Sequence, residues 1–241
     1  AEVTEKVDTL LAEISTILTS IEGIENLSSK DMDLVVSYGE RMSSIIMAAV
    51  LNAQWWNSLD LSKTQQGAHK NVLDQATTYA LLQNKKDNLA PVTVMGGFIS
   101  TDSQSGEVSN LGRGGSDYTA AIVAAALGAS VLEIWTDVDG FLTADPRLVK
   151  NAYTIDELSY IEAVELSNFG AKVIYPPTIY PVYEKNIPIM IKNTCNPTFK
   201  GTKISHLHGA EGKAIKGISS INDTCLITLQ GMGMVGVSGI S

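Results

Sequence analysis

The segment Leu111–Asp117 has the sequence Leu-Gly-Arg-Gly-Gly-Ser-Asp and contains the residues best suited to bind an anion. Glycines let backbone N–H groups approach an anion closely, and a helix that begins after them adds the favourable partial charge of its N-terminus. Arg113 can clamp a carboxylate or a phosphate with two hydrogen bonds. Ser116 and Asp117 also fit the ordinary capping of a first helical turn. The segment predicts an anion site, with a tight turn that carries a surface arginine as the alternative.

A second polar loop, Trp135–Arg147, follows directly on a predicted buried strand. Ligands of open α/β sheets bind at the carboxyl ends of strands, which is where Thr136 and Asp137 would lie. Asp145 and Arg147 follow in the same loop and suit a Mg²⁺ shell and phosphate charge. The loop therefore predicts a nucleotide site, with a polar turn as the alternative.

Two charged residues outside these loops could also contact a ligand. Glu40 lies in a predicted helix beside Gly39, whose missing side chain leaves room for a ligand, so its carboxylate could receive an ammonium group. Lys172 follows a predicted helix end and could reach a phosphate. Each residue alone is equally consistent with a solvated surface.

Other patterns in the sequence point less clearly to chemistry. Gly231–Gly236 fits the dinucleotide pattern G-x-G-x-x-G, but the acidic residue expected about 20 positions later is not among these residues. His206 and His208 lack neighbouring acids or cysteines, so no metal site is predicted there. With His69 as the remaining histidine, a Ser/His/Asp triad has little support.

The elements that must position these residues alternate between strands and helices after residue 91. Apolar periodicity and glycine stops predict helices over residues 3–21, 31–52, 72–82, 116–127 and 154–169, and strands over 92–95, 98–101, 107–111, 130–135 and 187–192. The pattern is weak between residues 55 and 88. The alternation favours an α/β sheet covered by helices. Glycine- and proline-containing polar sequence after residue 193 predicts a linker, and a strand over 224–229 then opens a second domain.

Composition excludes several classes of protein. With 44% hydrophobic and 18% charged residues, the chain should fold rather than remain disordered. Seventeen basic against 26 acidic residues give a net charge of −9, which disfavours nucleic acid and anionic membranes as partners unless basic residues cluster locally. Two cysteines without metal spacing fit a reducing, cytoplasmic setting. No apolar run is long enough to span a bilayer.

Six blocks of the sequence, in one order along the chain, resemble the aspartokinases. They are Val36–Ser43, Gly97–Ile99, Leu111–Asp117, Trp135–Arg147, Phe169–Pro176 and Asn193–Lys203. The resemblance implies the amino-acid-kinase fold, a three-layer α/β/α sandwich around a mainly parallel sheet, over residues 1–205. It further implies a linker at 206–212 and the beginning of a ferredoxin-like ACT regulatory domain at 213–241.

The resemblance also implies an activity. Aspartokinases transfer the γ-phosphoryl group of ATP to the side-chain carboxylate of L-aspartate, the first step towards lysine, threonine and methionine. ATP and Mg²⁺ would be required, an amino-acid end product would act as effector at the ACT domain, and the protein would be a homo-oligomer, in some members fused to homoserine dehydrogenase.

Site residues follow from the same resemblance, block by block. Aspartate would contact Glu40 through its ammonium group and Arg113 through its α-carboxylate, with Ser116 and Phe98 beside it. Asp117 would organise the site, and Lys172 would act on the phosphoryl group. The nucleotide would be held by Thr136, Asp137, Leu142, Arg147, Lys172 and Val173. No resident metal ligand is implied.

Two departures from the aspartokinase pattern leave alternatives open. Leu142 occupies a position where these enzymes usually have tyrosine, and the opening Lys-Phe-Gly-Gly-Thr-Ser strand, whose lysine should stabilise the transferring phosphoryl group, is not among these residues. One alternative is a non-catalytic effector-binding or assembly subunit. Another is an amino-acid kinase that acts on glutamate or acetylglutamate.

Overall fold

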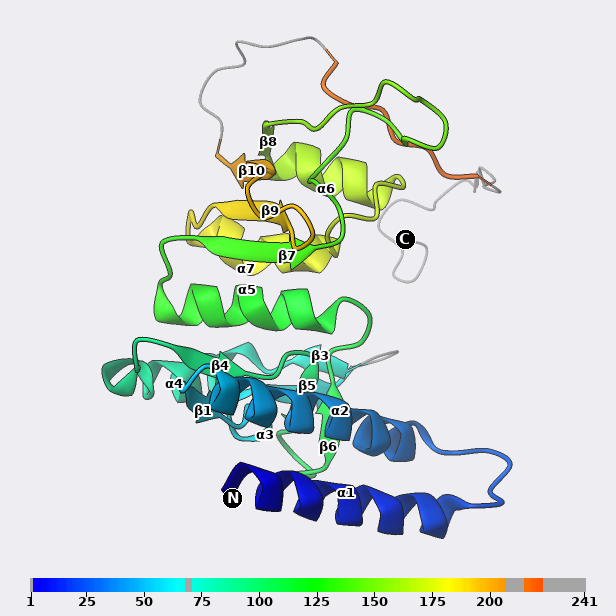
Figure 1. Cartoon of the computed structure of the whole chain (residues 1–241), viewed down its shortest axis with the longest axis vertical. Helices are drawn as coiled ribbons and strands as arrows, with labels where there is room; N and C mark the ends of the chain where they lie inside the picture. The colour runs from blue at the N-terminus through cyan, green and yellow to red at the C-terminus, as the bar shows by residue number, and fades with distance from the viewer. Residues whose placement is uncertain (1, 68–70, 207–214, 223–241) are drawn as a thin grey trace, which may run out of the picture.

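The computed structural model describes residues 2–67, 71–206 and 215–222 (Figure 1). The helices are α1 (Glu2–Ile21), α2 (Ser29–Val50), α3 (Ser58–Leu61), α4 (Gln75–Gln83), α5 (Gly115–Leu127), α6 (Tyr160–Asn168) and α7 (Ile179–Glu184), with 3-10 turns at Lys86–Asn88 and Pro176–Thr178. The strands are β1 (Gln54–Trp56), β2 (Lys63–Gln66), β3 (Asn71–Leu73), β4 (Thr93–Met95), β5 (Ile99–Asp102), β6 (Val108–Asn110), β7 (Leu132–Thr136), β8 (Glu157–Ser159), β9 (Ile189–Asn193) and β10 (Thr202–Ser205).

Helices α1 and α2 pack against each other at one end of the molecule (Figure 1). Their contact buries Leu10 of α1 against Tyr38 and Ile45 of α2, as the apolar spacing of both segments predicts. Helix α2 begins at a capping box, in which the Ser28 hydroxyl accepts from the Asp31 N–H and the Asp31 carboxylate accepts from the Ser28 N–H. This fixed start places Glu40 in the middle of α2.

Helix α5 lies across the middle of the molecule and belongs to two cores at once (Figure 1). Ala121 and Ala124 pack with the β7 and β9 strands, whereas Ile122 and Ala126 pack with Trp56 and Leu82 on the other side. A helix buried on two faces needs small or apolar residues all round, which explains why this segment lacks a polar stripe. Its start therefore has a fixed position between the two halves of the fold.

The strands form three sheets among the described residues, in the orders β1-β4, β7-β9-β10-β8 and β3-β2-β5-β6. Four strand pairs are parallel and three are antiparallel, so parallel pairing predominates only slightly. The predicted α/β architecture with mainly parallel pairing is confirmed in this coarse form. The single sheet that the prediction implied is divided in the part of the chain that the structure describes.

The four-stranded sheet that begins with β7 has one buried face and one open face. Ile134, Ile189 and Ile204 point into the core with α5, α6 and α7. The alternating residues on the other face form cross-strand ion pairs, Glu133 with Lys192 and Glu157 with Lys203. Helices thus cover one face of this sheet within the described residues.

Several predicted elements shift or were missed. The helix predicted over 154–169 begins only at Tyr160, because residues 157–159 pair with β10 as a strand and Ser159 caps the helix. The linker predicted after residue 193 contains β10, which pairs with both β9 and β8. The strand predicted over 224–229 and the turn over 231–236 lie outside the described residues. No helix among those described is long and apolar enough to cross a bilayer.

Candidate active site

The glycine loop before α5 is held in place by close packing rather than by hydrogen bonds from its arginine. Gly112 and Gly114 have φ values of +72° and +69°, which favour glycine. A methyl group on Gly114 would lie 2.4 Å from the Tyr175 side chain, so this ring packs directly on the loop backbone. Arg113 is exposed and has no ion pair with another described residue. Its guanidinium is therefore free to clamp an anion.

A cavity of about 340 Å³ opens beside this loop, and we call it the Arg113 cavity. Arg113, Asp117 and Lys172 bring three charged side chains to it. The hydroxyl of Ser167 also lines the cavity, and it is buried without a hydrogen-bond partner among the described residues. The remaining lining residues are Gly114, Val173, Ile174, Tyr175 and Pro176.

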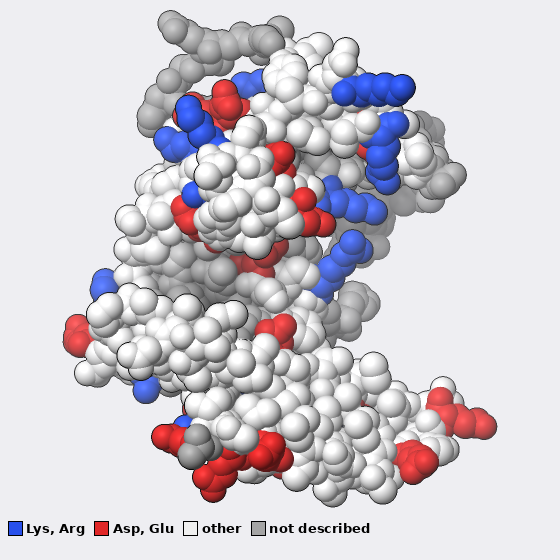
Figure 2. Space-filling view, viewed as in Figure 1, with Lys and Arg blue, Asp and Glu red and all other residues white. Residues whose placement is uncertain are grey.

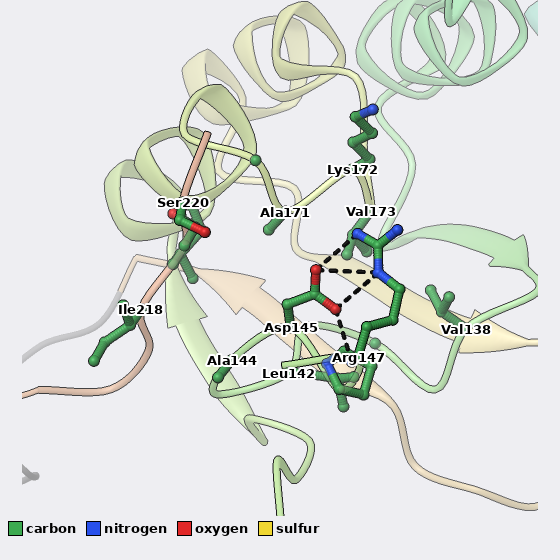
Figure 3. Close-up of a pocket in the computed structure, with 15 residues that line it drawn as sticks. Val138, Leu142, Ala144, Asp145, Arg147, Ala171, Lys172, Val173, Ile218 and Ser220 are labelled. Carbon is green, nitrogen blue, oxygen red and sulfur yellow. Dashed lines mark hydrogen bonds and ion pairs between the residues drawn. The ribbon is translucent and has the colours of Figure 1, made fainter. Parts of the chain in front are cut away.

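A second cavity of about 270 Å³, which we call the Arg147 cavity, lies next to the loop after β7 (Figure 3). Its apolar lining includes Val138, Leu142 and Ala171, and its charged lining consists of Arg147, Lys172 and one acid, Asp145. An apolar wall beside cationic side chains suits a ligand with a flat apolar part and a polyanionic part.

Lys172 and Val173 line both cavities. In Figure 3 the Lys172 side chain extends away from the Asp145–Arg147 pair. Its ammonium group makes no ion pair with a described residue. Lys172 is therefore a cation common to the cavity beside the glycine loop and the cavity beside the loop after β7. Both loops lie far from Lys172 in the sequence.

Arg147 is already engaged by a neighbouring carboxylate. Its Nη2 lies 2.7 Å from Asp145 Oδ2 and its Nε lies 3.0 Å from Asp145 Oδ1, a two-bond contact drawn in Figure 3. The hydrogen bonds from Arg147 lower the pKa of Asp145, so the pair is ionised near neutral pH. Because the guanidinium is largely exposed, it can also contact an anion in the cavity.

The predicted residues Glu40, Phe98 and Ser116 lie close together but outside both cavities. A methyl group on Gly97 would lie 2.8 Å from Ser116 Cα, so the loop before β5 packs directly on the start of α5. Glu40 is half-buried and forms no ion pair with a described residue. The adjacent cation, Arg41, pairs with Glu13 on α1 instead. An unpaired, partly desolvated carboxylate is a suitable partner for an ammonium group.

Phe98 has a strained backbone. Its φ is +69°, and the Ile99 N–H donates to the Gly97 carbonyl at 2.8 Å, which closes a tight γ-turn around Phe98. The Phe98 N–H donates to the Thr119 hydroxyl on α5 at 3.0 Å and so holds the turn. Such strain in a non-glycine residue is uncommon and concentrates at functional sites. Nothing in the sequence signals it.

Thr136 and Asp137 lie at the carboxyl end of β7, as predicted, but do not line the Arg147 cavity, whose lining starts at Val138. The Thr136 hydroxyl lies 3.2 Å from Asp137 Oδ1, and the Thr136 carbonyl accepts from the Thr194 N–H. Both residues therefore directly precede the first lining residue, Val138, without lining the cavity themselves.

The described residues gather no cluster of three or more acids, histidines or cysteines that could hold a metal. Mg²⁺ commonly enters kinase sites with the substrate phosphates and needs only one or two protein carboxylates. Asp117 is the carboxylate of the Arg113 cavity, and this donor set fits a metal that arrives with a nucleotide.

Figure 2 shows how charge is distributed on one face of the molecule. Lys and Arg side chains gather over the upper part, where β7–β10 and α6 lie, whereas acidic side chains dominate the end that carries α1. Within the cavity linings, two cations accompany one acid in each case, Arg113 and Lys172 with Asp117 and Arg147 and Lys172 with Asp145, although the whole chain has a net charge of −9.

Asp117 has no hydrogen-bond partner among the described residues, and burial raises the pKa of its carboxyl group. A carboxyl whose pKa is raised on folding contributes less stability as the pH rises through that interval. We therefore expect Asp117→Asn to increase Tm at pH 7, with the gain shrinking as the pH falls below the ordinary aspartate pKa of about 3.9 towards about pH 3, where both states of the wild type are largely protonated. Thermal unfolding followed by circular dichroism at both pH values measures this. The exposed Asp87→Asn is the control, and a lower Tm for Asp117→Asn at pH 7 would contradict the expectation.

Several residues of the site could not be found from sequence. Ser167 and Leu166 line the cavities but belong to no motif, and Tyr175, although it lies in the block Phe169–Pro176, was assigned no role at the glycine loop. Ile218 and Ser220 also line the Arg147 cavity, although the sequence places them in a following domain. Spacing along the chain carries no signal for contacts of this kind.

Comparisons with known proteins identify the family of this chain. The sequence pattern described as the amino acid kinase family matches residues 5–193. Bifunctional aspartokinase/homoserine dehydrogenase of Haemophilus influenzae is 41% identical over 208 residues, which are 84% of this chain and 25% of that protein. Lysine-sensitive aspartokinase 3 of Escherichia coli is 36% identical over 207 residues, which are 83% of this chain and 45% of that protein. The chain thus spans less than half the length of these relatives.

Solved structures of aspartokinases are also similar to this chain. E. coli aspartokinase III in complex with aspartate and ADP, in its R-state, is 33% identical and superimposes with a TM-score of 0.78 over 86% of this chain and 47% of that one. The same enzyme in complex with lysine and aspartate, in its T-state, has a TM-score of 0.75.

Proposed function

The chain belongs to the amino acid kinase family, and from this premise we propose that it forms the kinase part of an aspartate kinase. The reaction is transfer of the ATP γ-phosphoryl group to the side-chain carboxylate of L-aspartate, which gives 4-phospho-L-aspartate. The observation that carries the proposal is that Lys172 lines both cavities, which therefore share this part of their walls. A phosphoryl transfer needs a cation where the donor and acceptor meet.

The nucleotide occupies the Arg147 cavity. Its base lies against the apolar wall that includes Leu142 and Val173, and its phosphates meet Arg147 and Lys172. Leu142 offers only apolar contact to the base. Thr136 and Asp137, at the carboxyl end of β7, hold the nucleotide from the edge of this cavity.

Aspartate lies on the side of the glycine loop. Arg113 receives its α-carboxylate, and the half-buried carboxylate of Glu40 receives its ammonium group. Ser116 and Phe98 contact the same substrate from the tightly packed junction of β5 and α5.

No covalent nucleophile from the protein is required, since the aspartate carboxylate itself attacks the γ-phosphorus and ADP leaves. Catalysis then consists of bringing two anions together and neutralising their charge. Lys172 supplies positive charge from the shared wall, and Asp117, half-buried and without a hydrogen-bond partner among the described residues, organises the cations around the transferring group. The Mg²⁺ that accompanies ATP as part of the substrate would supply further positive charge to its phosphates.

The proposal also covers the residues after the kinase part, the layers of the fold, the cellular location and the oligomeric state. Residues 213–241 begin an ACT domain that binds an amino-acid end product, the kinase part is the α/β/α sandwich of the family, and the protein is a cytoplasmic homo-oligomer. The match to an aspartokinase whose structure contains lysine supports an effector of this kind.

The test is a coupled ADP-release assay with Mg-ATP and L-aspartate, L-glutamate or N-acetylglutamate as acceptor, together with calorimetric titration of Mg-ADP. The protein is expressed from its complete gene, because the chain spans less than half the length of its relatives. We expect turnover with aspartate well above that with the other acceptors. Turnover with glutamate but not aspartate would replace the proposal with the rival kinase, and effector binding without turnover would favour a non-catalytic subunit.

A further inference from the structure

Residues 215–222, which we call the strap, return to the kinase fold after the linker and pack beside α6 and the loop 141–155 (Figure 1). The Ile218 N–H donates to the Thr143 carbonyl at 2.9 Å. A methyl group on Gly217 would lie 3.2 Å from Ile155 and 3.5 Å from Leu166, so the strap backbone fits closely between these side chains.

The strap forms one side of the Arg147 cavity. Ile218, Ser219 and Ser220 are lining residues, and Figure 3 shows Ile218 and Ser220 on the side away from Lys172. A methyl group on Gly170 would lie 2.3 Å from the Ser220 carbonyl oxygen, so the strap and the end of α6 are in direct backbone contact. The peptide groups of Ser219 and Ser220 form no hydrogen bond with another described residue. They remain available to a ligand.

One ion pair ties the strap to α6. Lys216 Nζ lies 2.9 Å from Glu162, and both side chains are partly buried. Glu162 also accepts from the Ser159 N–H at 2.7 Å as part of the capping box that starts α6. Burial acts to raise the pKa of Glu162, but the hydrogen bonds from Ser159 and Lys216 outweigh it and lower the pKa. The carboxylate therefore stays ionised and linked to a rigid helix end.

We propose that the strap is a wall of the nucleotide site and that Lys216 is a positioning residue that holds this wall through Glu162. The proposal rests on the assignment of the Arg147 cavity to the nucleotide. The base and ribose of ATP then lie between the apolar side chains that include Leu142 and Leu166 and the free peptide groups of the strap. The phosphates lie towards Arg147 and Lys172, away from the strap.

The test compares Mg-ADP affinity and aspartate kinetics in three variants of Lys216. Lys216→Glu places a second carboxylate opposite Glu162 and should push the strap away, so we expect the Kd for Mg-ADP to rise about tenfold. Lys216→Gln removes the attraction alone, and a rise of about three- to fivefold is expected for a surface pair of this kind. Lys216→Arg should restore wild-type affinity. The KM for aspartate should stay unchanged in all three.

The matched control is Lys203→Glu, which makes the same charge change at an ion pair with Glu157 on the open face of the sheet. It should leave nucleotide affinity unchanged. Equal losses in Lys203→Glu and Lys216→Glu would mean a general charge effect and overturn the proposal. So would unchanged affinity in Lys216→Glu, or parallel losses for ADP and aspartate. If the wild type fails to bind Mg-ADP, the assignment of the cavity itself is wrong, which is a separate outcome.

Discussion

Replacing Lys172 with methionine should lower kcat for phosphoryl transfer to aspartate by about 10² to 10³, the usual cost of removing one preorganised group that stabilises transition-state charge. Lys172 lines both cavities and has no ion pair among the described residues. In the proposed reaction its ammonium group meets the phosphoryl group between the two cavities. Methionine preserves much of the length and apolar character of the side chain. The loss should therefore report the charge and not the packing.

Steady-state kinetics with Mg-ATP and aspartate measure this effect, and Lys185→Met, at an exposed lysine after α7, is the control. Lys172→Arg should retain part of the activity, since it keeps the positive charge. A rise in the KM for ATP without a fall in kcat would mean that Lys172 binds the ground state alone. A kcat within about tenfold of wild type would move the catalytic charge to another residue.

Replacing Arg113 with alanine should raise the KM for aspartate about ten- to a hundredfold while the KM for ATP changes little. A hydrogen-bonded contact between charged groups contributes about 1.5 to 3 kcal/mol, and because Arg113 is exposed we expect its whole two-bond contact with the α-carboxylate to lie in this range. Arg113 has no partner within the described protein, so its removal leaves no buried charge behind. The fold should be unaffected.

The two arginines provide opposite controls for each other. Arg147 lines the other cavity, so Arg147→Ala should weaken ATP more than aspartate. Arg113→Lys keeps the charge but cannot clamp a carboxylate with two parallel bonds, and it should restore only part of the affinity. Unchanged aspartate kinetics in Arg113→Ala would mean that the glycine loop serves the fold alone.

Local signals in the sequence determined most of the helices and the main features of the loops. Apolar spacing and glycine stops predicted α1, α2 and α5 to within a few residues, and the short polar turn predicted the β5–β6 hairpin. The resemblance to aspartokinases, drawn from six ordered blocks, is confirmed by the relatives. These features depend on residues a few positions apart, which is why a sequence alone can reveal them.

Which of these residues come into contact depends on the packing of segments that are distant in the sequence. Strands β1, β2 and β10 are only three or four residues long, and they exist because distant segments supply their hydrogen-bond partners. Lys172 joins the two cavities because α6 ends next to the glycine loop, and Tyr175 packs on Gly114 for the same reason. The strap reaches the Arg147 cavity across a stretch of chain without any motif. Contacts between segments far apart in the chain depend on how the cores pack, and packing leaves no periodic trace in the sequence.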